Sequence, residues 1–365
     1  MSASGRGTPF RCPRCEQPLR LAGQEQPRCA ACGEDVTTAD GVLSFVRDPQ
    51  LLAELEHYEA EYAAPSGGGP TDPDVLGQLW HDNPYSPFDE WMLEAMGELC
   101  DRVVVVLGNG RATKELHLLA HWPRALVISD LSANAMRALR AEFRAHAERE
   151  DLFFAAIDGQ DLPFTDGSVD VLYGYAFVHH LPDLERFVAE AARVLKPGGR
   201  GVFSDNAYSH LWQKAKHGWL RSAMRVAHRQ NPISEEDVRY TLAGGFVPAD
   251  LEALVTAAGC RAWFRPTGLV HYLATRATQI FATESSRFDL GRRHWRRDGR
   301  GGERLVWPYR PVLEAALRID GWLERFAVVR ANRMRLIWGF EKPTAAAANE
   351  PGASAASISR IAGLS

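Results

Sequence analysis

One stretch of this chain constrains its fold more than any other. Five consecutive aliphatic residues, Val103–Leu107, lead directly into a glycine-containing turn. An uninterrupted apolar run is typical of a central parallel strand, because helices cover both of its faces. A helix-compatible segment, a second apolar run ending at Asp130 and another helical segment follow. This order predicts an α/β fold with a doubly wound, Rossmann-like sheet.

The turn after the first strand predicts a ligand site at the carboxyl edge of the sheet. Its glycines allow a tight turn and a close approach of the backbone to a ligand. Asp130 lies 22 residues after Gly108, where a carboxylate can accept both hydroxyls of an adenosyl ribose. A nicotinamide dinucleotide site would use much the same parts. The candidate cofactor residues of this unit are Gly108, Asn109, Gly110, Asp130, Leu131 and Ser132.

The following segment reads DLFFAAIDGQDLPFTDGSVDVLYGYAFVHHLPDLERFVAEAARVLKPGG. From residue 103 to 204, the chain resembles the UbiE-like class I methyltransferases (methyltransferase type 11 family) in the order, spacing and type of its residues. The resemblance implies a seven-stranded methyltransferase sheet and S-adenosylmethionine as the cofactor. It also implies that Asp158, Gly159 and Gln160 meet the adenine. Tyr173 and Tyr175 flank the predicted methyl site, where each could either pack or contact the ligand, and Tyr175 is a further candidate cofactor residue.

Two positions depart from the family's pattern. The family usually has an acidic residue where this chain has Val106, and Ala112 replaces the last glycine of the turn. Either change could weaken cofactor binding, which leaves a non-catalytic binding protein on a decayed core as an alternative. Because Asp130 and Asp158 are both retained, an active methyltransferase is the favoured interpretation.

Methyl transfer from a sulfonium depends mainly on positioning, since the leaving group is already activated. A general base is needed only when the acceptor is a hydroxyl or another protonated nucleophile. His179 and His180 follow the fourth predicted strand and are the candidate catalytic residues. The alternative is that His180 packs and caps the next helix.

Four cysteines near the N-terminus form two Cys-x-x-Cys pairs, at Cys12 and Cys15 and at Cys29 and Cys32. Each pair lies in a turn-forming context, so the four thiolates can converge on one ion. Tetrahedral sulfur coordination suits Zn²⁺, and four protein sulfurs leave no open position for substrate. The spacing therefore predicts a structural zinc ribbon, whose folding depends largely on the metal.

The remaining composition suggests a modular chain. Two tyrosines, Tyr58 and Tyr62, would share one face of a helix that could act as a lid over the cofactor. The predicted parts are a zinc ribbon at 1–46, a linker with this lid helix at 47–86, the methyltransferase domain at 87–342 with a helical, basic C-terminal insertion (insertions at 205–245 and 273–331), and a disordered tail at 343–365.

Charge is distributed unevenly along the chain. Residues 211–335 hold 22 Lys or Arg against 12 Asp or Glu, although the whole chain has a net charge of −4. This basic lobe admits nucleic acid or a membrane surface as a partner, but a solvated face is the favoured interpretation. Without an apolar leader, the chain is expected to be cytoplasmic.

The favoured function is methyl transfer to a small-molecule, glycan or lipid-type acceptor. An RNA methyltransferase is the main alternative, because a ribosomal guanine methyltransferase family also joins a ribbon to this fold. No Asn-Pro-Pro-Tyr-like motif follows the fourth predicted strand, where GYAFVHH stands.

Overall fold

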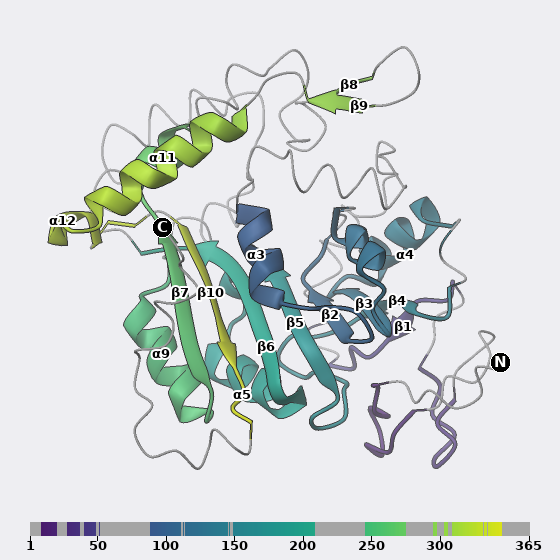
Figure 1. Ribbon diagram of the computed structural model, residues 1–365. Helices are drawn as coiled ribbons and strands as arrows, with labels where there is room; N and C mark the ends of the chain where they lie inside the picture. Colours follow the sequence, from purple (N-terminus) through teal and green to yellow (C-terminus); the bar gives the residue numbers. More distant parts are fainter. Residues whose placement is uncertain are drawn as a thin grey trace.

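A computed structural model describes most of the predicted core (Figure 1). The described residues are 9–19, 28–36, 40–48, 51, 88–110, 112, 114–144, 146, 149–208, 245–274, 295–297, 303–305, 309–330, 332–333 and 335–344. The predicted lid helix with Tyr58 and Tyr62, most of the insertion at 205–245 and most of the tail lie outside them.

The first eight elements are β1 (Leu43–Ser44), α3 (Phe88–Met96), β2 (Val103–Leu107), η1 (Lys114–His121), β3 (Ala125–Asp130), α4 (Ala133–Glu142), β4 (Leu152–Ala156) and β5 (Val169–Tyr175). The others are η2 (Val178–His180), α5 (Leu184–Val194), β6 (Leu195–Asn206), α9 (Pro248–Ala257), β7 (Arg261–Thr267), β8 (Trp295–Arg297), β9 (Glu303–Leu305), α11 (Tyr309–Leu323), α12 (Ala327–Arg330) and β10 (Arg335–Glu341).

The sheet has the predicted doubly wound form, with one additional strand. Its order is β1-β4-β3-β2-β5-β6-β10-β7, in which β10 runs antiparallel to both of its neighbours. The seven predicted strands are present, and the eighth, β1, pairs in parallel with β4. From β2 the chain winds first toward β4 and then returns to β5 on the other side of β2. Ligands of such sheets bind at this reversal, beyond the carboxyl ends of the strands.

Helices cover the two faces of the sheet unequally. The helices α3, η1 and α4 bury one face, whereas α5 and α9 cover part of the other (Figure 1). The connection from β4 to β5, residues 157–168, contains no helix. A crossover between parallel strands usually supplies one, so part of that face needs another cover.

The N-terminal segment supplies this cover. Phe10 is fully buried and its ring lies 5.2 Å from the ring of Phe45 and 5.7 Å from that of Phe153. Its backbone forms an antiparallel bridge with Phe164 in the helix-free connection. The cysteine segment and the sheet thus share one continuous hydrophobic core. The predicted boundary at residue 46 therefore falls inside a packed unit, because β1 belongs to the sheet.

A buried carboxylate stabilises the edge of the sheet opposite the presumed ligand site. Asp170, near the start of β5, accepts hydrogen bonds from Lys196 Nζ (2.6 Å), the backbone N–H of Val103 (2.9 Å) and Arg102 Nη1 (3.2 Å). Burial alone would raise the pKa of Asp170, but Lys196 and these donors hold it below its ordinary value.

We expect Asp170→Asn to lower the free energy of unfolding by about 2 kcal/mol. This loss is smaller than that for a fully buried ion pair, because the cationic partners of Asp170 remain solvent-accessible. Because the pKa is depressed in the folded state, this contribution is complete above the ordinary carboxyl pKa and is lost as the pH falls below it. Denaturant titrations from pH 7 to pH 3 should therefore show a gap between wild type and variant that closes in acid. A gap that stays constant with pH would contradict this role.

Candidate active site and metal centre

The predicted cofactor residues come together at the carboxyl edge of β2, β3 and β4. Asp130 ends β3, and its Oδ2 accepts a hydrogen bond from the backbone N–H of Gly110 (2.7 Å). Its Oδ1 accepts another from the N–H of Ser132 (2.9 Å). These two hydrogen bonds fix the position of the Asp130 carboxylate at the carboxyl edge of the sheet. Leu131 lies between Asp130 and Ser132 in this turn.

The turn after β4 has a similar carboxylate. Asp158 Oδ1 accepts a hydrogen bond from the backbone N–H of Gln160 (2.8 Å), which holds the turn. The Gln160 side chain in turn accepts from the N–H of Asp183 at the start of α5 (2.8 Å). Asp158 thus faces the same edge as Asp130 with its second oxygen outside these internal contacts.

The structure accommodates both departures from the family's pattern, one on β2 and one in the turn that follows it. Val106 is fully buried among the side chains that α3 and α4 cover, where an acidic group would lose its hydration. Asn109 Nδ2 donates to the carbonyl oxygen of Ala112 (2.8 Å), which closes the turn. Asn109 Oδ1 is buried and has no hydrogen-bond partner among the described residues.

Phe177 was missed by the sequence interpretation. Its side chain lies against three glycines at the strand ends: a Cβ atom would come within 2.2 Å of the ring at Gly108, 2.6 Å at Gly159 and 3.0 Å at Gly174. The glycines of this edge are therefore needed for an aromatic ring of the protein itself, and not only for the approach of a ligand. Gly108 also has a φ of +62°, which favours glycine.

We expect Gly159→Ala to destabilise the protein by about 2 kcal/mol, because the added methyl overlaps the Phe177 ring. In a Phe177→Ala background the same change should cost little, since the obstacle is gone. Gly321→Ala is a matched control, because a Cβ there meets nothing within 4 Å. Equal losses of Gly159→Ala in both backgrounds, measured by thermal unfolding, would contradict this packing role.

His179 and His180 differ sharply in their surroundings. His179 Nδ1 lies 2.8 Å from Asp205 Oδ1, and its side chain is 12% exposed. Asp205, at the end of β6, is buried and also accepts a hydrogen bond from Trp338 Nε1 (3.3 Å). His180 is exposed, and its ring centre lies 4.0 Å from that of His179, with the two ring planes tilted by 41°. Asp205 is a functional candidate that the sequence interpretation missed.

The two tyrosines of β5 also differ in their burial. Tyr173 is fully buried in the core, which agrees with the packing alternative for this residue. Tyr175 lies at the end of the strand, and the guanidinium of Arg335 lies 4.9 Å from its ring centre.

Burial, with the positive charge of Arg335, lowers the pKa of the nearby His271 to about 4, so this imidazole is neutral at pH 7.

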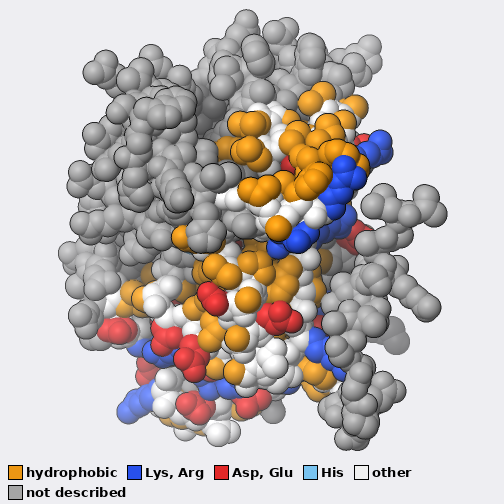
Figure 2. All heavy atoms as spheres, turned by 90° about the vertical axis from the view of Figure 1, so that its left-hand side faces the viewer, with side chains coloured by type: hydrophobic (Ala, Val, Ile, Leu, Met, Phe, Trp, Pro, Cys, Tyr) orange, Lys and Arg blue, Asp and Glu red, His pale blue; other side chains and the backbone are white. Residues whose placement is uncertain are grey.

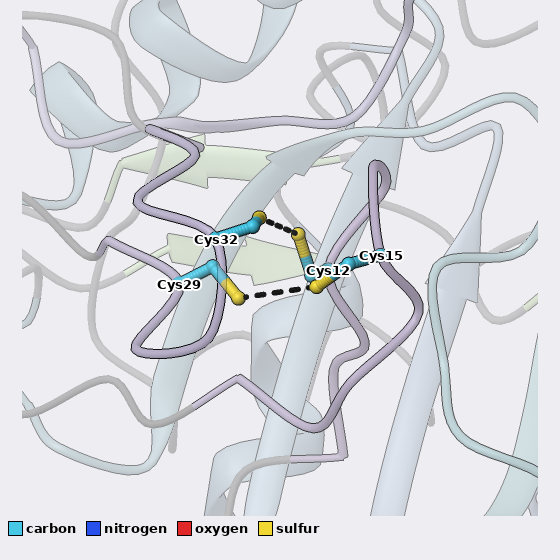
Figure 3. Close-up of side chains that lie close together, drawn as sticks. All are labelled: Cys12, Cys15, Cys29 and Cys32. Carbon is cyan, nitrogen blue, oxygen red and sulfur yellow. Dashed lines mark hydrogen bonds between the residues drawn. The ribbon is translucent and has the colours of Figure 1, made fainter.

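The four N-terminal cysteines converge as predicted (Figure 3). Their sulfur atoms all lie within 4.8 Å of one another. Cys12 Sγ is 3.6 Å from Cys32 Sγ, and Cys15 Sγ is 3.5 Å from Cys29 Sγ. Tetrahedral zinc bonds to sulfur place two ligands about 3.8 Å apart, which fits these distances. A disulfide requires about 2.05 Å and does not fit.

Two equivalent turns deliver the sulfur atoms. In each, the first cysteine, Cys12 or Cys29, donates its N–H to the carbonyl five residues later and accepts from the N–H four residues later. That fourth residue, Glu16 or Gly33, has a positive φ. The N–H groups of Cys32 and Ala31 lower the pKa of Cys29 to about 7, whereas desolvation and neighbouring thiols raise the pKa of Cys15 and of Cys32.

One family of known proteins matches the central part of the chain. Residues 105–203 match a family model described as a methyltransferase domain. Over these residues the chain is similar to class I S-adenosylmethionine-dependent methyltransferases. The match covers the strands and turns that carry Asp130, Asp158 and His179. It ends two residues before Asp205 and does not include the cysteine segment.

Three relatives illustrate the range of acceptors. The 27-O-demethylrifamycin SV methyltransferase of Amycolatopsis mediterranei is 31% identical over 36% of this chain and 54% of its own. The malonyl-acyl-carrier-protein O-methyltransferase of Xylella fastidiosa is 26% identical over 52% and 65%. The ubiquinone/menaquinone C-methyltransferase UbiE of Acidiphilium cryptum is 32% identical over 27% and 40%. This chain thus spans about half the length of the curated relatives that it matches.

The methyltransferase domain and the cysteine cluster belong to one packed structure. Within the part of the chain that the structure describes, no helix has the length and apolarity needed to cross a membrane.

Proposed function

We propose that this chain methylates a protonated nucleophile, such as a hydroxyl, on a small-molecule, glycan or lipid-type acceptor, with S-adenosylmethionine as the donor. The observation that carries the proposal is the contact between His179 and Asp205, at the same edge of the sheet as Asp130 and Asp158. Two of the matched relatives are named for O-methylation, which supports a hydroxyl acceptor for this chain.

Asp130 and Asp158 are the proposed cofactor ligands. Asp130 would accept both ribose hydroxyls, because its carboxylate stands at the end of β3 and is held there by two backbone N–H groups. Asp158 would accept from the adenine amino group, next to the Gly159 and Gln160 backbone. The bound cofactor supplies an activated methyl group. The chain then has only to orient the acceptor and manage its proton.

His179 is the proposed general base. Asp205 accepts the Nδ1 proton of His179, so that Nε2 carries the lone pair that can take a proton from the acceptor. Because Asp205 is buried and held by Trp338, its charge would stabilise the imidazolium that results. His180 is exposed, and in our proposal it would shape the entrance to the site.

The ribbon is proposed to bind one structural Zn²⁺ through Cys12, Cys15, Cys29 and Cys32. All four positions would be protein sulfurs, so the metal would hold the N-terminal segment on the sheet rather than take part in methyl transfer.

Two measurements test the function. Titration calorimetry should detect binding of S-adenosylmethionine, and no binding at millimolar cofactor would overturn the enzyme proposal in favour of a decayed core. Metabolite profiling with a labelled methyl donor should then reveal the acceptor. If the label entered only RNA, the chain would be an RNA methyltransferase instead.

With the acceptor known, His179→Ala should lower kcat about 10² to 10⁴-fold, because the acceptor proton loses its base. Asp205→Asn should lower kcat to a similar degree while the imidazole remains in place. His180→Ala is the matched control and should stay near wild type. Calorimetry should give the same affinity for S-adenosylmethionine in all three variants. A full kcat in His179→Ala would assign the histidine a packing role.

A further inference from the structure

The surface of α11 carries an apolar stripe that the proposed methyl transfer does not use. Its side chains are large, and 45% to 57% of each is exposed. The members of the apolar stripe are Val312, Ile319, Trp322 and Phe326. Their spacing of seven, three and four residues places them along one side of α11 and the turn after it. Two further exposed leucines, Leu269 and Leu273, lie on the short helix at 269–274.

This stripe is not the side by which α11 attaches to the protein. The adjacent side of α11 carries Leu313, Ala316 and Asp320, all of which are buried. Asp320 accepts hydrogen bonds from the backbone N–H groups of Val270 (3.0 Å) and His271 (2.8 Å), and thereby ties α11 to the short helix. An amphipathic surface helix normally turns polar residues outward, whereas α11 has apolar residues on both sides.

The exposed charges beside the stripe are all positive. Between Pro311 and Arg330, the exposed charged residues are Arg318, Arg325 and Arg330. The Arg325 guanidinium lies over the Trp322 ring, 3.6 Å from its centre. The acidic Glu324 is half-buried and paired with Arg333 at 2.7 Å. Figure 2 shows the same pattern, with hydrophobic side chains gathered on the upper part of the described surface and basic side chains at their edge.

We propose that this stripe docks onto an anionic lipid surface. Tryptophan and phenylalanine insert at the level of the headgroups, and arginines beside them pair with acidic lipids. A second copy of the chain fits less well, because a two-fold contact would bring the same arginines together. Nucleic acid would leave the aliphatic Val312 and Ile319 without a suitable contact. The proposal goes beyond methyl transfer and does not rest on it.

Co-sedimentation of the full chain with vesicles tests the proposal. Vesicles of phosphatidylcholine and phosphatidylglycerol at a ratio of 3:1 should bind the protein at least about tenfold more strongly than pure phosphatidylcholine. Ile319→Ser combined with Trp322→Ser should weaken binding by about tenfold or more. Arg318→Gln combined with Arg325→Gln should remove most of the preference for the anionic vesicles.

Trp122→Asn is the matched control, because Trp122 is 74% exposed on a different element and its φ of +53° suits asparagine. Unchanged thermal unfolding would establish that the variants remain folded. The proposal is overturned if the wild type does not bind anionic vesicles, or if the Ile319 and Trp322 double variant binds them as well as the wild type does. A wild-type dimer that this variant converts to a monomer, with vesicle binding intact, would assign the stripe to self-association.

Discussion

Replacing Cys12 and Cys29 with serine should release the metal and destabilise the whole protein. The metal is expected to supply most of the folding free energy of the cysteine segment. That segment buries Phe10, Leu19 and Val36 in the same core as the sheet. Each such side chain contributes about 1.5 to 3 kcal/mol when buried, so the variant should unfold roughly 10 to 20 °C lower.

Metal analysis and thermal unfolding check this expectation together. The wild type should carry about one zinc per chain, and the double variant none. Cys100→Ser is the matched control, because Cys100 is exposed and lies outside the cluster. A chelator should reproduce the effect of the double variant on the wild type. Loss of zinc without a lower unfolding temperature would show that the ribbon does not support the sheet.

Replacing Asp130 with alanine should weaken S-adenosylmethionine binding by at least about 100-fold. Each hydrogen bond to a charged group contributes about 1.5 to 3 kcal/mol, and the proposed ribose contacts number two. The variant also frees the N–H groups of Gly110 and Ser132, which Asp130 now holds in place. Both effects act on the cofactor side of the site.

Titration calorimetry measures this loss directly and needs no acceptor. Asp130→Asn should fall between wild type and Asp130→Ala, because an amide retains one acceptor oxygen. Asp161→Ala is the control, since Asp161 has an exposed side chain in the nearby turn after β4. An unchanged dissociation constant in Asp130→Ala would refute the proposed ribose contact.

Much of the cofactor half of the site followed from local sequence. The apolar run Val103–Leu107, the glycine turn and the position of Asp130 at a strand end all depend on residues close together in the chain. Parallel strands present their carboxyl ends at one edge, so Asp130 and Asp158 could be placed together without a structure. Likewise, the spacing of the cysteines predicted one cluster of four sulfurs, which the structure contains.

Local sequence could not predict the contacts between distant segments of the chain. Asp205 meets His179 only because β5 and β6 are neighbours in register, and Trp338 reaches Asp205 from 133 residues away. The glycine pattern suggested a ligand, but its role in accommodating Phe177 depends on the path of the chain after β5.

The sequence by itself determined seven of the eight strands of the sheet, the place of Asp130 and Asp158 at its carboxyl edge and which four thiols form a cluster, because periodicity and spacing act over short distances. Tertiary structure alone decided that the cysteine segment covers a face left open by the helix-free connection after β4, and that Asp205 orients His179. The physical reason is that burial and hydrogen bonding depend on which distant segments the fold brings into contact.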